Sequence, residues 1–259
     1  MNNIYPLFSS SKGNSVYIGN PESGILIDVG VSYKRLCSAM NKCGLDISAV
    51  CAVFITHEHS DHVKGLSVLT KKHKLTLYGQ GITLRHLIDS SLINEQTIIN
   101  EINSPVSILD MTVQSFDTPH DTEQSCGYRI DFKDKKSCAV CTDLGYVTHT
   151  VDEHLLGADT VLIEANYDNN MLIYGPYPPY VKQRIKSEHG HLSNDDSAKQ
   201  ILRLIEHGTT KIILGHLSQE NNSPELAEQT VRDTLERGNI SDYILHVASA
   251  ETDGTMVVI

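Results

Sequence analysis

The residues best suited to chemistry lie in the segment His57-Glu58-His59-Ser60-Asp61-His62. Neutral imidazole nitrogens and carboxylate oxygens are ligands of divalent metal ions such as Zn²⁺. His57 and His59 are two residues apart, so they project to the same side of an extended chain. Asp61 and His62 follow where the chain turns, so they can point to a second position beside the first. Because one metal ion needs three or four ligands, this segment could begin two metal sites.

The runs on either side of this segment predict how it is held. An apolar strand-like run, residues 51–55, precedes it, and a helix-like run, residues 63–69, follows it. The histidines are therefore expected where a buried strand ends and a helix begins. The alternative is a surface turn of solvated histidines, and the spacing H-x-H-x-D-H behind a buried strand argues against it.

Three further strand-like runs each lead to a side chain of a metal-ligand type, namely His120, Asp143 and His216. Each is a weak signal alone, since a single loop histidine is usually a surface residue. Together with the first segment they give seven ligand-type side chains, five of them histidine. Two metal ions that share one bridging carboxylate need about this many ligands, with positions left for water and substrate.

Net charge and the absence of long apolar runs argue against a general polyanion binder and a membrane protein. The net charge of −11 argues against a general polyanion binder, although bound divalent ions and a local basic patch could still serve a nucleic-acid enzyme. The first twenty residues contain no secretory signal, and no apolar run approaches the roughly 18 residues of a membrane span. The six cysteines then indicate reduced thiols. We expect a cytoplasmic protein without membrane contact.

Two motifs resemble a zinc site and a phosphate loop, but their surroundings argue against both functions. The pair Cys138-x-x-Cys141 lies in a strand-like run, where positions three apart face opposite sides, and no second C-x-x-C completes a zinc site. The segment from Ser9 to Ser15 resembles a phosphate loop, but it lacks G-x-x-x-x-G-K-[ST] and leads into a strand.

Strands and helices alternate along the chain without an internal repeat or a linker. Helices are expected over residues 82–92, from Ser193 to residue 205, and over Pro224–Arg237, and two strands, 243–247 and 255–259, close the chain. The pattern predicts one domain over residues 1–259, with two sheets between helical layers.

The H-x-H-x-D-H segment, the downstream His120, Asp143 after a strand and the late His216 resemble the metallo-β-lactamase fold superfamily over the whole chain. The resemblance implies an α+β fold, a four-layer αββα sandwich of two mixed β-sheets flanked by helices. It implies that one metal ion is held by His57, His59 and His120, and the other by Asp61, His62 and His216. Asp143 and a water would bridge the ions, and Asp28 matches the structural aspartate of the superfamily.

Three segments, residues 7–15, 171–194 and 215–222, are similar to the bacterial YycJ/WalJ group of this superfamily. The resemblance implies a DNA-directed exonuclease of the DNA-repair type that acts 5′ to 3′. Glu164-Ala165 and Gly190-His191-Leu192-Ser193 also resemble motifs of the ribonuclease Z branch, in which the histidine assists phosphodiester cleavage. The long exosite arm and the inserted β-CASP domain are missing, which implies a compact enzyme and puts tRNA specificity in doubt.

The chemistry of the residues agrees with phosphodiester hydrolysis. Two divalent ions can deprotonate a bridging water and stabilise the phosphoryl oxygens. Asp61 could ligate one ion and hold the proton of the nucleophile, while His191 could protonate the leaving oxygen or stabilise the phosphate. Glu164 could orient His191. The alternatives are an exposed histidine before a helix cap and a solvated carboxylate at a strand end.

Three tyrosines between residues 174 and 180 are followed by basic side chains at every second position up to residue 186. Among these residues, Lys182, Arg184 and Tyr180 could bind a nucleic-acid strand by phosphate contacts and base stacking. An ordinary solvated loop is the alternative.

The predicted function is a binuclear-metal-dependent phosphodiesterase, a 5′-to-3′ exonuclease of single- or double-stranded DNA. The predicted cofactors are two Zn²⁺ or Mn²⁺ ions, with iron as a third option. A small-molecule hydrolase of the same fold, such as a thioesterase, lactonase or β-lactamase, is the alternative, and a non-catalytic binding module fits poorly because the ligand set is complete.

Overall fold

The computed structural model describes residues 2–259. The chain forms two compact units. We call the first the N-terminal unit; it contains the chain up to Leu109 together with Thr122–Cys126 and Ser249–Ile259. The second, the central unit, consists of Asp110–Asp121 and Gly127–Ala248. That these units form the one domain predicted over residues 1–259 stays a prediction.

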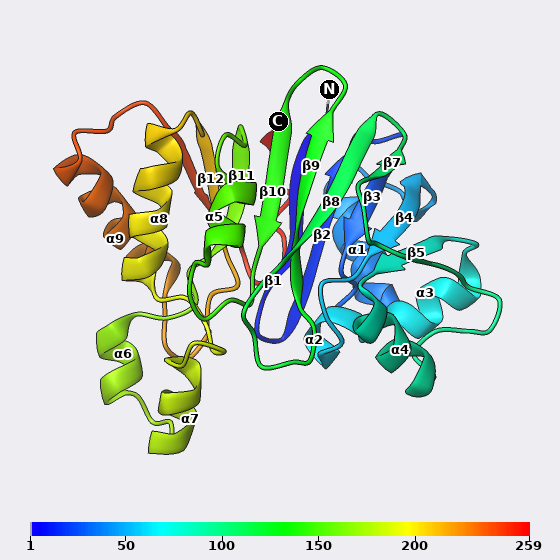
Figure 1. Cartoon of the computed structure of the whole chain (residues 1–259), viewed down its shortest axis with the longest axis horizontal. Coiled ribbons are helices and arrows are strands. Elements are labelled where there is room, and N and C mark those ends of the chain that lie inside the picture. The colour runs from blue at the N-terminus through cyan, green and yellow to red at the C-terminus, as the bar shows by residue number, and fades with distance from the viewer. Residues whose placement is uncertain (1) are drawn as a thin grey trace. The chain divides into compact units, whose positions relative to one another are not determined.

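The N-terminal unit is built on a seven-stranded mixed sheet (Figure 1). Its strands follow the order β14 (Val257–Val258), β1 (Asn3–Ser10), β2 (Gly13–Gly19), β3 (Gly24–Ile27), β4 (Val50–Phe54), β5 (Thr76–Gly79) and β6 (Ile98–Glu101). The strands from β14 to β3 pair antiparallel, and those from β3 to β6 pair parallel. The parallel part therefore brings the carboxyl ends of β3 and β4 to one edge, where the histidine segment follows β4.

Helices of the same unit cover one face of this sheet. They are α1 (Tyr33–Lys42), α2 (Ser60–Val63), α3 (Leu66–Lys72) and α4 (Gly81–Asp89), with a 3₁₀ turn at Ile47–Ala49. Leu36 of α1, Leu69 of α3 and Leu87 of α4 are fully buried in one apolar cluster with Leu26 and Val53 of the sheet. This cluster anchors β4, which precedes the histidine segment, and α3, which follows it, so the segment is held at both ends.

The second sheet is also mixed and seven-stranded, and most of it lies in the central unit. Its order is β13 (Ile244–Val247), β12 (Lys211–Gly215), β11 (Thr160–Glu164), β10 (Ser137–Cys141), β9 (Cys126–Phe132), β8 (Met111–Asp117) and β7 (Val106–Ile108). The strands from β10 to β13 are parallel, and β9 and β10 form an antiparallel pair. Parallel neighbours again place the ends of β10, β11 and β12 at one edge.

Five helices belong to this unit: α5 (His149–Leu155), α6 (Asn169–Tyr174), α7 (Pro179–Ile185), α8 (Asn194–Glu206) and α9 (Pro224–Arg237). Figure 1 shows α8 and α9 side by side, and Ile201, Leu204 and Val231 pack with Val161 of the sheet in one buried cluster. The side chain of Ser193 accepts a hydrogen bond from Asp196 N–H and starts α8 as expected.

The two sheets with flanking helices confirm the predicted α+β class, and α9 has the predicted bounds. Three expected elements are shorter: the helix over 82–92 ends at Asp89, the strand over 243–247 begins at Ile244, and the strand over 255–259 contains two residues. Residues 179–185 form helix α7 instead of a loop, because Pro179 at its first position favours a helix start. Within residues 2–259, no helix combines the length and apolar composition that crossing a membrane requires.

Candidate functional site

The histidine segment lies where the sequence predicts it, directly after β4 and at the start of α2. His57 and His62 are fully buried, and their rings are 4.1 Å apart between centroids. The ring centroids of His57 and His59 are 4.6 Å apart. Buried, closely spaced imidazoles overturn the alternative of a solvated surface turn.

The buried carboxylate of Asp28 fixes the tautomer of His62. Oδ2 of Asp28, which lies just after β3, is 2.7 Å from Nδ1 of His62 and accepts a 2.7 Å hydrogen bond from the hydroxyl of Thr56. The amide of Thr56 donates to Asp28 Oδ1 over 2.9 Å. His62 Nδ1 therefore carries the proton, and Nε2 offers the lone pair for a metal ion. Asp28 has the ordering role expected of the structural aspartate.

Thr56 fixes the tautomer of His57 in a similar way. Its hydroxyl oxygen lies 3.0 Å from Nδ1 of His57. Because this hydroxyl donates its proton to Asp28, it accepts from His57 Nδ1–H, and Nε2 of His57 keeps the lone pair that could bind a metal ion. No sequence pattern predicts this role of Thr56, and its position between the buried strand and His57 is the one signal that points to it.

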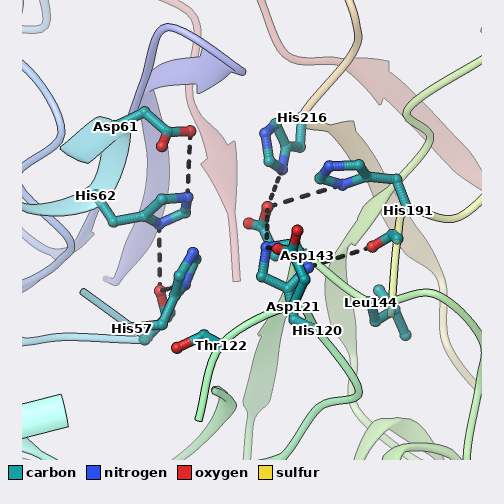
Figure 2. A network of polar contacts seen from close by, with 12 residues as sticks. His57, Asp61, His62, His120, Asp121, Thr122, Asp143, Leu144, His191 and His216 are labelled. Atoms are coloured by element: carbon teal, nitrogen blue, oxygen red, sulfur yellow. Dashed lines mark hydrogen bonds and ion pairs between the residues drawn. The ribbon is translucent and has the colours of Figure 1, made fainter. Parts of the chain in front are cut away.

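Glu58, the residue between the first two histidines, anchors a second segment of the N-terminal unit. The hydroxyl of Thr122 donates to Glu58 Oε1 over 2.5 Å. The other carboxylate oxygen, Oε2, is buried and has no hydrogen-bond partner within residues 2–259. Figure 2 shows Thr122 near His57. The motif thus uses its intervening glutamate to hold the segment Thr122–Cys126.

The central unit gathers the other predicted ligands at the ends of its strands. Asp143 follows β10, His216 follows β12 and His120 follows β8. Asp143 Oδ1 lies 3.0 Å from His216 Nδ1 and 3.8 Å from His120 Nε2, and all three side chains are buried (Figure 2). Burial lowers the pKa of His120, an effect that the carboxylate of Asp143 opposes but does not cancel. A lowered pKa keeps His120 neutral, which is the form that binds a metal ion.

Glu164 and His191 come together as the sequence analysis expected. Glu164 ends β11, is 0% exposed, and places Oε1 2.8 Å from His191 Nδ1. Its Oε2 accepts hydrogen bonds from the amides of Leu144 and Leu192, at 3.0 and 3.2 Å. This buried, fully engaged carboxylate overturns the alternative of a solvated group at a strand end.

The electrostatic environment keeps the ring of His191 protonated. Burial favours a lower pKa, but the charges of Glu164 and Asp143, together with the hydrogen bond to Glu164, raise the pKa of His191 to about 9. Its side chain is 22% exposed, so this imidazolium remains accessible. A divalent ion on Asp143 would offset part of the rise. Figure 2 shows the ring directed toward Asp143 and His216.

The three residues that were predicted to bind a nucleic-acid strand, Tyr180, Lys182 and Arg184, lie on α7. Tyr180 is 74% exposed. The amino group of Lys182 donates to the carbonyl oxygens of Ile173 and Gly175, at 2.7 and 2.8 Å, and so closes the end of α6. The guanidinium of Arg184 forms an ion pair with Asp121, whose Oδ1 also lies 3.2 Å from His120 Nε2. Both cations thus have structural partners, and Tyr180 presents an open ring.

The cysteine pair Cys138 and Cys141 lies inside the second sheet. Cys138 and Cys141 are both buried in β10, and all six cysteines are free thiols within residues 2–259. Burial raises the pKa of the Cys138 thiol well above its usual range. A buried thiol that stays protonated is inert, as the strand placement predicts.

The loop after β12 is held by buried asparagines that the sequence analysis did not assign. Asn166 donates to the carbonyl oxygen of His216 over 2.9 Å. Asn222 donates to Ala165 O over 2.9 Å and exchanges hydrogen bonds with Asn194. Two of these asparagines lie in segments that resemble the YycJ/WalJ group, and that was the available signal.

The central unit therefore contains a cluster of histidine and carboxylate side chains that could bind a metal ion, and the N-terminal unit contains the closely spaced imidazoles of His57, His59 and His62. In the central unit, ligand atoms of Asp143, Glu164, His191 and His216 lie within 4.8 Å of one another. Since both oxygens of Glu164 are engaged, the groups best suited to ligation there are Asp143 and His216, with His120 beside them. The donor set of nitrogen and oxygen atoms suits Zn²⁺, Mn²⁺ and iron.

Comparisons with known proteins identify the family of this chain. The family model described as beta-lactamase superfamily domain matches residues 24–217. The exodeoxyribonuclease WalJ of Streptococcus pneumoniae is 36% identical over 253 residues, which cover 95% of this chain and 94% of that protein. The exodeoxyribonuclease YycJ of Bacillus anthracis is 36% identical over 233 residues, or 89% of this chain and 88% of that protein.

Solved structures agree on the fold. The metallo-β-lactamase fold protein YhfI from Bacillus subtilis matches with a TM-score of 0.73 at 15% identity, over 97% of this chain and 98% of that protein. This match confirms the predicted metallo-β-lactamase fold. The chain therefore belongs to the beta-lactamase superfamily and, with its 36% identical relatives, to the WalJ/YycJ group.

Proposed function

We propose that this protein is a metal-dependent exonuclease that degrades single- or double-stranded DNA from the 5′ end, in the manner of a DNA-repair nuclease. The observation that carries the proposal is the 36% identity, over nearly the whole chain, to two proteins named exodeoxyribonucleases. The six free cysteines support a cytoplasmic location.

The proposed cofactor is a pair of divalent ions, Zn²⁺ or Mn²⁺, with iron as the third option. The proposed ligands of one ion are His57, His59 and His120, those of the other are Asp61, His62 and His216, and Asp143 serves both. The tautomers that Thr56 and Asp28 impose support this assignment for the N-terminal unit. When bound, the ions supply a water that ionises near neutral pH and positive charge beside the phosphodiester oxygens.

Side chains of this protein then accept and donate the protons of the reaction. Asp61 holds the proton that the attacking water loses as its oxygen bonds to phosphorus. The bond from phosphorus to the 3′ oxygen breaks, and the imidazolium of His191 donates its proton to that oxygen. Glu164 keeps His191 oriented and charged. The products are a 5′-mononucleotide with a free 3′-hydroxyl and a strand that carries a new 5′-phosphate.

The DNA strand is proposed to lie along α7. Tyr180 offers an exposed ring on which a base can stack. Lys182 and Arg184 contribute positive charge toward phosphates, and their contacts within the chain hold them in place at little further entropic cost.

The test is hydrolysis of 5′-labelled single- and double-stranded DNA by protein loaded with Zn²⁺ or Mn²⁺, beside a thioester and a chromogenic cephalosporin. Release of labelled mononucleotides is expected, with activity abolished in His59→Ala and lowered about 100-fold in His191→Ala. Rapid turnover of the thioester or the cephalosporin with intact DNA would establish the small-molecule hydrolase instead.

Two control variants show whether the loss of a histidine lowers activity through the reaction or through the fold. His189→Ala removes an exposed histidine two residues from His191, and His86→Ala removes a half-buried histidine on α4. Both variants should keep the activity of the unchanged protein within about twofold.

A further inference from the structure

Asn14 lies against two of the proposed metal ligands. It is 6% exposed and belongs to β2, just after the turn that joins β1 to β2. Its amide nitrogen Nδ2 lies 3.0 Å from Nε2 of His62 and 3.3 Å from Oδ2 of Asp61. The same nitrogen lies 3.4 Å from the carbonyl oxygen of Asp61. These contacts join residues 47 and 48 positions apart within the N-terminal unit.

The orientation of this amide is determined by its other end. The backbone N–H of Ser10 donates to Asn14 Oδ1 over 3.2 Å. The oxygen therefore faces the hairpin turn, and the NH₂ group, which has two protons and no acceptor capacity, faces the ligands. Asn14 is consequently a donor toward Asp61 and His62 rather than a ligand of the metal ion.

The backbone around Asn14 is equally constrained. Gly30 N–H donates to Asn14 O over 2.8 Å. A Cβ atom on Gly30 would lie 1.7 Å from Asp61 O and 2.5 Å from Asn14 N, so no side chain fits between these two segments. The strand that carries Asn14 therefore lies directly against the backbone of Asp61.

From this geometry we propose that Asn14 is a positioning residue, which holds the carboxylate and the peptide of Asp61 for metal binding. When a cation takes the lone pair of His62 Nε2, the N–H contact at that atom is released, and the contacts with Asp61 remain. Asn14 then orders Asp61 without contributing charge. The inference rests on the proposed metal site but not on the proposed DNA substrate.

The first test is a metal titration by competition with a chromophoric chelator, without DNA. Asn14→Ala should weaken the binding of Zn²⁺ by about 10- to 100-fold, the usual effect of losing a residue that orders a ligand. The matched control is Asn20→Ala, since Asn20 Oδ1 closes the next turn of the same sheet by accepting from the amides of Glu22 and Ser23. Asn20→Ala should lower the melting temperature of the metal-free protein and leave Zn²⁺ affinity unchanged.

The second test uses the unchanged protein, so it does not depend on the folding of a variant. In ¹⁵N-labelled protein, the side-chain NH₂ resonances of Asn14 should shift on saturation with Zn²⁺, because one N–H loses its acceptor, while those of Asn20 should stay in place. Unmoved Asn14 resonances, Zn²⁺ affinity within twofold in Asn14→Ala, or no Zn²⁺ binding by the unchanged protein would each overturn the inference. Tight Zn²⁺ binding without DNA hydrolysis would refute the proposed function alone.

Discussion

Oε1 of the fully buried Glu164 lies 2.8 Å from Nδ1 of His191, and this contact charges the ring that the proposed mechanism uses as an acid. Glu164→Gln retains the size of the side chain and removes its charge. We expect the pKa of His191, raised to about 9 in the metal-free protein, to fall toward its ordinary value, and DNA hydrolysis to drop about 10- to 100-fold. NMR titration of the His191 ring in metal-free protein and a nuclease assay measure the two effects.

The exposed Glu188, three residues before His191, provides the matched control. Glu188→Gln should change neither the titration nor the activity. An unchanged titration curve of His191 in Glu164→Gln would contradict the role assigned to Glu164.

Asp28 controls which nitrogen of His62 can bind a metal ion. Asp28→Asn would place either an amide NH₂ group or a weaker acceptor beside His62 Nδ1 and Thr56, which now donate to this carboxylate. We expect Zn²⁺ affinity to fall about 10- to 100-fold, because the ring loses its enforced tautomer. Competition titration measures the affinity. Asp46→Asn, which alters the carboxylate that accepts from the amide of Ser48, should leave the affinity unchanged.

Comparison of Asp28→Asn with Asp28→Ala separates the effect of the lost charge from the effect of backbone strain. Asp28 has a left-handed backbone, with φ of 60°, and asparagine tolerates this conformation as well as aspartate does. Asp28→Ala should therefore lower the melting temperature more than Asp28→Asn. Equal melting temperatures for the two variants would contradict this explanation.

The strand ends explain why most of the site could be predicted. His57, Asp143 and His216 follow strands whose apolar runs are visible in the sequence, and parallel neighbours bring such ends to one edge of a sheet. The left-handed φ angles of Asp143 and His216, 58° and 54°, were not predictable. These conformations are costly for residues other than glycine, and the surrounding packing and hydrogen bonds of the folded unit sustain them.

The supporting residues could not be predicted for a different reason. Thr56 and Asn14 act through contacts with side chains 28 and 48 positions away, Asp28 and His62 respectively, and no local pattern encodes such pairings. A hydroxyl or an amide is also common in turns, where it usually serves the backbone. The structure was needed to find which of these polar groups faces the ligands.

Stability should depend on pH through the contact of α5 with α8. Asp152 binds the guanidinium of Arg203 with 2.8 Å contacts to each carboxylate oxygen and accepts from Gln200 over 2.9 Å. The hydrogen bonds from Arg203 hold the pKa of Asp152 below its usual value, although partial burial opposes them. A lowered pKa means that this stabilisation is complete above about pH 4 and is lost as pH falls through the pKa of the folded state.

Asp152→Asn should accordingly lower the free energy of unfolding by about 1 kcal/mol at pH 7. Urea unfolding of metal-free protein between pH 7 and pH 3 should show this difference shrinking toward the acid end. Asp196→Asn, at the exposed pair with Lys199, provides a comparison with a smaller effect. A difference that persists undiminished at pH 3 would contradict the electrostatic origin.

Glu58 and Thr122 should behave as a coupled pair. Thr122→Val keeps the shape of the side chain and removes the hydroxyl that donates to Glu58 Oε1. The half-buried carboxylate of Glu58 then loses this hydrogen bond at Oε1, while its buried Oε2 already has no partner within residues 2–259. We expect a loss of about 1–3 kcal/mol in the free energy of unfolding. Glu58→Gln in the same background should cost less than it does alone, since the partner is already gone. A double-mutant cycle by urea unfolding should give a coupling energy of about 0.5–3 kcal/mol, whereas Thr230→Val on α9 should show additive effects with Glu58→Gln.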